Sequence, residues 1–311
     1  MQEPIAKYFH VGLIHPMAYP SVIKGEGPIL ETLKKILDDE YFGAVEVTWI
    51  QDPESRAEAA KMLKCAHVDV IFAGQPPLLT QKLDINAADE ADRQKAIEQC
   101  KNSVDQAYEL GASILVLLSG PDPADGDRKA ATDRLVDSLI QVCKYAQSKA
   151  NGKALTVSLE TFDRTTDKKC LIGPTTEAAE VAKRVRAECP NFGLTVDLSH
   201  QPMLEGESIA QMVETAAPYL VHTHIGNAML GDTSSPAYGD QHPAFGCDCG
   251  ENDVDEVVEF LKSIQKIGFF KKELPTKMPV VSFEVKPLPG EDGDIVVAGA
   301  KRVLNEAWAR L

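Results

Sequence analysis

The sequence has few of the features that mark membrane, secreted or nucleic-acid-binding proteins. It contains no run of about 18 apolar residues and no basic N-terminal stretch followed by an apolar core, so we expect neither a membrane span nor a signal peptide. Basic residues are scarce: 32 Lys and Arg against 47 Asp and Glu give a formal net charge of −15. This charge repels nucleic acid and anionic membranes at long range. We therefore predict a cytoplasmic protein that binds a small molecule rather than nucleic acid or membrane.

Cysteine provides neither a disulfide framework nor a complete thiolate site. The seven cysteines are an odd number, and Cys65, Cys100 and Cys143 fall on the apolar stripes of expected helices, as free thiols do. Cys247 and Cys249 form a close pair, but no second pair completes a tetrahedral soft-metal site. We therefore predict structural or incidental roles for these cysteines.

The sequence also lacks a linker-like stretch and a glycine-rich phosphate turn after its first apolar run, where it reads Ile14-His15-Pro16-Met17. Short apolar runs instead alternate with helical patterns in which apolar residues recur three and four apart. Strands are expected at residues 9–14, 44–49, 68–73, 114–118, 155–159, 192–196, 219–223 and 280–283. Helices are expected at about 29–37, 54–63, 97–108, 135–143, 176–186, 208–215, 254–267 and 295–309.

This alternation predicts the α/β class. Eight strand–helix units favour one (β/α)8 TIM barrel over residues 1–311, with a long loop at about 231–251 after the seventh strand. The competing architecture, an open doubly wound sheet, usually carries the glycine-rich turn that is missing here.

Four of the expected strands end at a residue type that binds metal ions. Glu160, Asp197, His224 and Glu284 directly follow the apolar runs of the fifth to eighth strands. Such groups are costly beside a core unless a charge compensates them, and in a barrel the strand ends point into the mouth. We therefore predict that the four side chains bind one divalent metal ion. Three carboxylates and one imidazole favour Mn²⁺, Mg²⁺ or Co²⁺ over Zn²⁺.

The sequences around these residues resemble a known family, the xylose-isomerase-like TIM barrel superfamily. The similar segments are Ser158-Leu159-Glu160, Val196-Asp197-Leu198-Ser199-His200, His222-Thr223-His224 and Ser282-Phe283-Glu284. The superfamily includes sugar-phosphate isomerase/epimerase proteins and ketose 3-epimerases. The resemblance implies that Glu160, Asp197, His224 and Glu284 hold one metal, that the two glutamates also move protons, and that His200 contacts a substrate oxygen.

This donor set suits proton transfer on a sugar. Removing the proton beside a sugar carbonyl creates an enediolate, whose charge a metal stabilises. Glu160 and Glu284 on opposite faces of that planar intermediate would exchange its proton. We therefore predict a metal-dependent isomerase or epimerase that acts on a sugar or keto-sugar.

Two basic residues follow the proposed catalytic glutamates closely. Lys286 shares the strand parity of Glu284 and faces the same side if the strand continues, and Arg164 follows Glu160 by four residues. Each is a candidate to bind a substrate hydroxyl, carboxylate or phosphate. The alternatives are a solvated lysine and a surface ion pair of the arginine.

The long loop contains Asp240 and His242. Apurinic endonucleases of the same superfamily use such an Asp-x-His pair in a cluster of three zinc ions. Their histidines from strands three and four have no counterpart here, where the sequence reads Ala73-Gly74-Gln75 and Leu118-Ser119-Gly120. Asp240 and His242 therefore complete a second metal site, bind substrate or form a loop turn. The loop itself is a candidate lid or subunit contact.

Alternatives to the sugar isomerase or epimerase stay open. One is a metal-dependent hydrolase or lyase, either an endonuclease-like phosphoesterase or an enzyme that cleaves keto-glycosides. Another is a sugar-binding barrel without turnover. Ketose 3-epimerases usually carry an arginine after the strand-seven histidine, whereas this sequence reads Gly226-Asn227-Ala228-Met229, so the sugar and its phosphorylation stay open. Related barrels commonly associate, which makes a homo-oligomer one expectation.

Overall fold

The computed structural model describes residues 3–124 and 126–311, and in this part of the chain eight parallel strands form one sheet. The strands are β1 (His10–Leu13), β2 (Ala44–Val47), β3 (Asp69–Ala73), β4 (Ile114–Leu118), β5 (Thr156–Glu160), β6 (Phe192–Asp197), β7 (Leu220–Gly226) and β8 (Val280–Glu284). Their order is β1-β8-β7-β6-β5-β4-β3-β2. The predicted (β/α)8 barrel is therefore confirmed.

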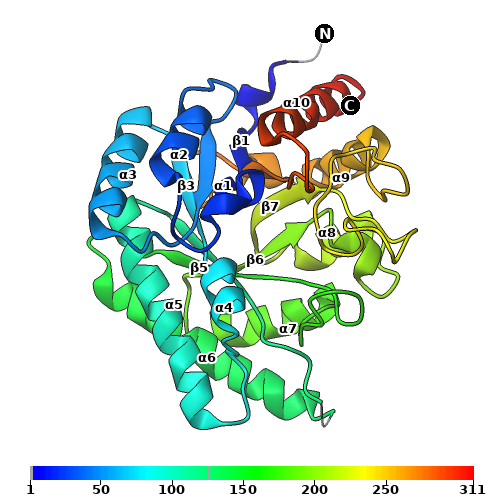
Figure 1. Ribbon diagram of the computed structural model, residues 1–311. Coiled ribbons are helices and arrows are strands. Elements are labelled where there is room, and N and C mark those ends of the chain that lie inside the picture. The colour runs from blue at the N-terminus through cyan, green and yellow to red at the C-terminus, as the bar shows by residue number, and fades with distance from the viewer. Residues whose placement is uncertain (1–2, 125) are drawn as a thin grey trace.

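Helices surround the strands and cover the outside of the barrel (Figure 1). They are α1 (His15–Ala18), α2 (Ile29–Leu37), α3 (Pro53–Ala66), α4 (Gln75–Gln81), α5 (Glu90–Leu110), α6 (Arg128–Lys149), α7 (Thr175–Arg186), α8 (Ile209–Ala216), α9 (Val254–Lys266) and α10 (Gly293–Ala309). Short 3-10 helices lie at Ile5–Lys7, Pro20–Val22, Gln201–Met203 and Phe269–Lys271. Among the helices of the described residues, none combines the length and apolar character needed to cross a membrane.

The barrel closes between β1 and β2, the two ends of the strand order. The amide of Gly43 donates to the carbonyl of Val11 at 3.0 Å, and Ile14 forms a parallel bridge with Glu46. Close approach requires glycine at position 43, because a Cβ there would lie 2.7 Å from the ring of His10. This closure joins β1 to β2 and so gives the barrel a continuous interior.

Strand alternation decides which side chains face that interior. The small inner cluster of Ala44, Ile71, Ile114, Val116 and Val280 is separate from the large core between strands and helices. Side chains two residues further along a strand point the same way, and on β2 and β8 these side chains become polar toward the carboxyl end. The inner hydroxyls of Ser158 and Thr195 bond at 2.7 Å two positions before Glu160 and Asp197.

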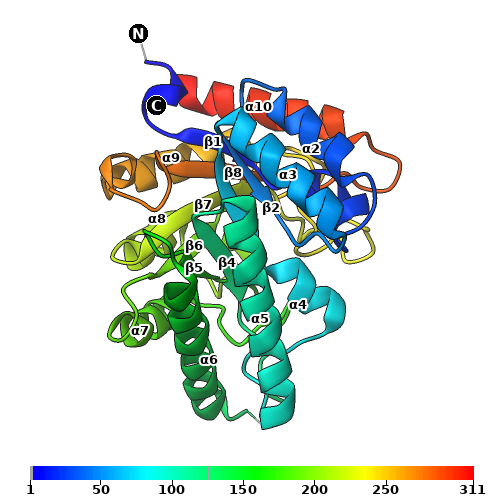
Figure 2. The same cartoon turned by 90° about the vertical axis from the view of Figure 1, so that its left-hand side faces the viewer.

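Two short helices at the barrel mouth were not predicted. α1 and α4 each begin directly after a strand and carry proline in their first turn, where the missing amide hydrogen is not needed. Figure 2 shows α4 on the same side of the barrel as the segment between β7 and α9. These pieces build walls around the carboxyl ends of the strands.

Candidate metal centre

Four side chains from adjacent strands converge at the carboxyl ends of β5 to β8. One donor atom each from Glu160, Asp197, His224 and Glu284 lies within 4.8 Å of the other three, and all four residues are buried. Nδ1 of His224 is 3.0 Å from Oε1 of Glu160 and 3.0 Å from Oε2 of Glu284. The strand ends therefore bring together the four residues that the sequence singled out.

The chemistry of this group fits a divalent cation. Three carboxylates share a buried space with one imidazole, and buried carboxylates are costly without a compensating charge. Burial raises the pKa of Asp197, as does the neighbouring Glu284, although His200 opposes the shift. Oε2 of Glu284 is buried and receives no hydrogen bond of good geometry from the described residues. A cation would satisfy this oxygen and lower the cost of the carboxylates.

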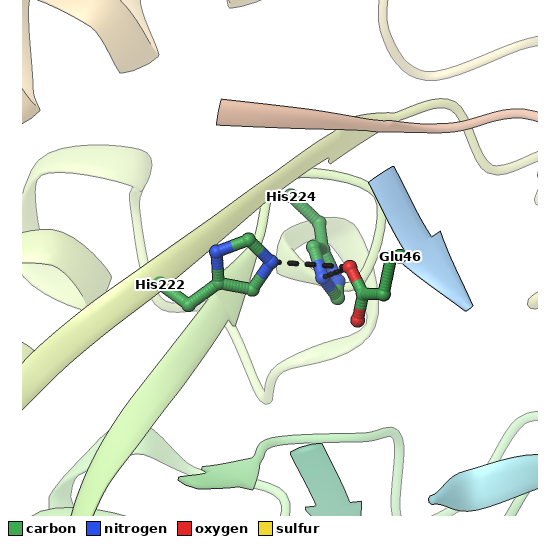
Figure 3. Close-up of side chains that lie close together, drawn as sticks. All are labelled: Glu46, His222 and His224. Carbon is green, nitrogen blue, oxygen red and sulfur yellow. Dashed lines mark hydrogen bonds and ion pairs between the residues drawn. The ribbon is translucent and has the colours of Figure 1, made fainter. Parts of the chain in front are cut away.

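Glu46 and His222 hold His224 from inside the barrel. One oxygen of Glu46, Oε2, lies 3.0 Å from Nε2 of His224 and 3.1 Å from Nε2 of His222 (Figure 3). All three side chains are fully buried. Burial opposes ionisation of Glu46, but the two histidines outweigh it and lower its pKa to about 2. Glu46 thus occupies Nε2 of His224 and leaves Nδ1 facing the donor group.

A second polar group lies beside the first. Nε2 of His200 is 2.9 Å from Oδ1 of Asp240, and Nε2 of His242 is 2.8 Å from the same oxygen. His200 donates from Nδ1 to the carbonyl of Thr161 at 2.8 Å, so Nε2 carries the lone pair in the neutral ring. Asp197, His200 and His242 could together hold a cation. The geometry therefore brings Asp240 and His242 into contact with the strand-end residues.

The charges of this second group are mutually stabilised. Burial opposes ionisation of Asp240, but His200 and Lys168 outweigh it and hold the pKa of Asp240 well below its usual value. Nζ of Lys168 lies 2.9 Å from Oδ2 of Asp240. Burial alone would lower the pKa values of His200 and His242, yet the surrounding carboxylates raise both. Lys168 and the two histidines thus offset the negative charge of Asp240.

The two remaining predicted substrate residues lie in different places. Lys286 lines the cavity above the donor group and donates from Nζ to Oε1 of Gln241 at 2.9 Å. Arg164 is buried and donates to the carbonyl of Leu171 at 2.7 Å, with ion pairs to Glu177 and Glu205 at 2.5 and 3.0 Å. These contacts favour a structural role for Arg164, and its contact with substrate stays a prediction.

A cavity of about 810 Å³, counted to its open mouth, lies directly over the donor group. Glu46, Asp240, His242 and Glu284 line it together with residues of α1 and α4. Of the four strand-end donors, Glu284 lines this cavity, so a ligand can reach it from the mouth of the barrel.

A family model described as xylose isomerase-like TIM barrel matches residues 39–286, most of the chain. The chain belongs to this family. No curated protein matches its sequence.

This xylose isomerase-like barrel is also similar to solved structures. An L-ribulose 3-epimerase has a TM-score of 0.70 at 16% identity, covering 97% of this chain and 96% of that one. An IolI protein with a bound zinc atom has a TM-score of 0.72 at 16% identity, covering 97% and 99%. The 3-keto-D-glucoside 4-epimerase YcjR from E. coli has a TM-score of 0.64 at 16% identity, covering 96% and 99%. Identities this low show a shared fold.

Sequence reasoning missed several residues of this barrel's polar interior. No role is predicted for Glu46 or His222 from the sequence, although their strand parity with Ala44 and His224 places them inside the barrel. Gln75, two residues after the end of β3, donates to Oε2 of Glu160 at 2.6 Å. The position of Lys168 could not be predicted from the sequence, because nothing in its loop indicates a contact with Asp240.

Proposed function

We propose that the protein is a divalent-metal-dependent isomerase or epimerase of a sugar or sugar derivative, working in cytoplasmic carbohydrate metabolism. The observation that carries the proposal is the convergence of Glu160, Asp197, His224 and Glu284 within 4.8 Å beneath an open cavity. Sugar epimerases among proteins of the same fold support the proposal.

In this proposal Glu160 and Glu284 bind the cation and also move the proton. Each glutamate contacts Nδ1 of His224 from its own strand, so the two carboxylates approach the space above His224 from different strands. Gln75 orients Glu160 by donating to its second oxygen. The carboxylate of Asp197 accepts hydrogen bonds from the amide of Ser199 at 2.8 Å and from the hydroxyl of Ser199 at 2.5 Å. These bonds suit a metal ligand that does not transfer protons.

Other residues position the substrate or exclude water. His200, with Nε2 toward Asp197 and Asp240, is proposed to contact a substrate oxygen. Lys286 and His242 line the cavity and are proposed to bind hydroxyl groups. The cation, when bound, supplies the positive charge that stabilises a developing enediolate. Mn²⁺, Mg²⁺ and Co²⁺ match this oxygen-rich donor set better than Zn²⁺.

Solvent deuterium exchange tests the acid–base roles. We expect the Mn²⁺-loaded protein in D2O to incorporate deuterium into at least one ketose from a panel that includes L-ribulose and D-tagatose. Glu160→Gln and Glu284→Gln should lower the exchange rate about 100-fold or more, the usual contribution of a general acid or base. Glu259→Gln, on the exposed side of α9, is the matched control.

Metal content must be measured on the same samples, because both glutamates are proposed ligands. A variant that keeps Mn²⁺ but loses exchange supports the proton role. Retained exchange in both glutamine variants, or no exchange in the native protein with any ketose, would contradict the proposed reaction.

The second candidate function is a metal-dependent hydrolase or lyase, acting on a phosphoester or a keto-glycoside. The observation that favours it is the group Asp197, His200 and His242, which offers a second cation site next to the first. Elemental analysis separates the readings: one metal per chain favours the isomerase or epimerase, whereas two or three favour the hydrolase or lyase.

A further inference from the structure

The cavity over the donor group has two chemically different walls. One wall consists of polar residues from the carboxyl-end loops, namely Lys168, Gln241 and Lys286. The other wall comes from α1, α4 and the segment after α1. It is mostly apolar, with Gln75 and Thr80 of α4 beside six apolar residues: Pro16, Met17, Pro20, Ile23, Pro76 and Leu79. Three of these six are prolines, so much of the apolar wall is conformationally restricted and does not rearrange easily into a polar one.

Leu79 marks the outer edge of the apolar wall. Its exposed fraction is 44%, and within residues 3–124 and 126–311 only Ile295 is another large hydrophobic residue of comparable exposure. Because Leu79 is exposed and also lines the cavity, its side chain is available for an apolar contact with a bound ligand. The wall is continuous with the donor group, since Glu284 and Leu79 line the same cavity.

A fully hydroxylated sugar does not match this wall. A hydroxyl pressed against proline, methionine and leucine loses its bonds to water and gains none from the protein. Hydroxyls have partners on the polar wall and near the donor group. The part of a ligand that faces α1 and α4 should therefore be apolar.

The positive charges of the polar wall argue against a phosphate at that end. Lys168 is paired with Asp240 at 2.9 Å and with Asp167 at 3.2 Å. Lys286 donates from Nζ to Oε1 of Gln241 at 2.9 Å. A phosphate would have to compete with these partners, whereas a neutral group would not.

We propose that the substrate has two unlike ends: a hydroxyketone of a sugar over the donor group, and a neutral aryl or alkyl substituent against the apolar wall of α1 and α4. This inference rests on the proposed isomerase or epimerase function and narrows its substrate class to glycosides with an apolar aglycone. Burial of the aglycone supplies affinity, while the sugar end presents the carbon that loses its proton.

A matched pair of ligands tests the inference by binding. The probes are a methyl and a phenyl glycoside, each with one ring hydroxyl oxidised to a ketone, titrated calorimetrically into the Mn²⁺-loaded protein. Burial of a phenyl-sized group should make the phenyl compound roughly 10-fold to 100-fold tighter. Leu79→Asn should reduce this ratio several-fold, whereas the control Ile295→Asn should leave it unchanged, because Ile295 does not line the cavity.

Four results would overturn the inference. Three of them are equal binding of the two glycosides, failure of both to bind, and an unchanged ratio in Leu79→Asn. A fourth is a native oligomer that Leu79→Asn dissociates in sedimentation experiments, since the apolar wall would then be a subunit contact. Deuterium exchange into simple ketoses tests the proposed reaction separately. If the protein catalyses this exchange but does not prefer the phenyl glycoside, only the proposal of an apolar aglycone is refuted.

Discussion

The contact of Glu46 with His222 and His224 leads to a sharp prediction about metal affinity. Because Glu46 engages Nε2 of His224, it fixes the ring with Nδ1 toward Glu160 and Glu284. In Glu46→Gln the side-chain volume is kept but the negative charge is lost. The neutral amide offers one acceptor oxygen for two imidazoles, so the orientation and basicity of His224 should both suffer.

The size of the effect follows from the position of Glu46. Its pKa of about 2, against 4.5 for the ordinary group, means that the surroundings favour the carboxylate by roughly 3 kcal/mol. Loss of a residue that orients a metal ligand typically lowers metal affinity about 10-fold to 100-fold. We therefore expect a loss of about 1.4 to 2.8 kcal/mol in Mn²⁺ binding.

Calorimetric titration of Mn²⁺ into the metal-free protein measures this loss, with Glu259→Gln as the control. Circular dichroism and urea unfolding establish that Glu46→Gln is folded. His222→Gln keeps the contact between Glu46 and His224 and should cost less affinity. A folded Glu46→Gln protein that binds Mn²⁺ as tightly as the native protein would refute the reasoning.

Three further predictions concern stability and protons. Burial lowers the pKa of His15 to about 3, so the unfolded chain binds a proton at position 15 below about pH 6.5 and the folded one does not. Stability should therefore fall by about 2 kcal/mol between pH 7 and pH 5 through this group, and urea unfolding of His15→Gln should lack that part of the slope. Arg164→Leu should lower the free energy of unfolding by about 1 to 3 kcal/mol through the lost bond to the Leu171 carbonyl, with Mn²⁺ affinity retained; weakened ligand binding at unchanged stability would instead support a substrate contact. Finally, carboxylates raise the pKa of His224 well above its usual value in spite of burial, so Mn²⁺ binding at pH 7 should release a proton, and calorimetry in buffers of different ionisation enthalpy should detect it. No buffer dependence would contradict that expectation.

The strands that carry the site were predictable because buried parallel strands have short apolar runs of nearly constant length. The expected run at 280–283 and the polar residue after it correspond to β8, which ends at Glu284. Strand ends of a barrel share one face, so the proximity of the four donors followed from topology without any knowledge of distances. The short α1 and α4 were not predicted, since four and seven residues are too few for a helical repeat to stand out.

Residues in loops could not be placed in the same way. Its spacing after Glu160 makes Arg164 a candidate to face the cavity, with a surface ion pair as the alternative. In the structure, the carboxylate of Asp163 accepts from the amides of Thr166, Asp167 and Lys168, at 2.6 to 2.7 Å. This tight turn is accompanied by contacts of Arg164 with Leu171, Glu177 and Glu205, while Lys168 reaches Asp240. The spacing of residues along the chain predicts where a side chain points only while the backbone is regular. The backbone stops being regular at the end of β5.

The role of Glu46 shows a different gap between sequence and structure. Strand parity places Glu46 and His222 inside the barrel, but the two residues are 176 positions apart and meet only because the sheet closes. Their height along the barrel axis depends on the stagger of every strand between them, including the irregular register between β6 and β7. Parity is a local property of one strand, whereas stagger accumulates around the whole sheet. The proximity of the candidate donors at the mouth could thus be inferred from their own strands, while the carboxylate that contacts His224 from below could be found only in the closed barrel.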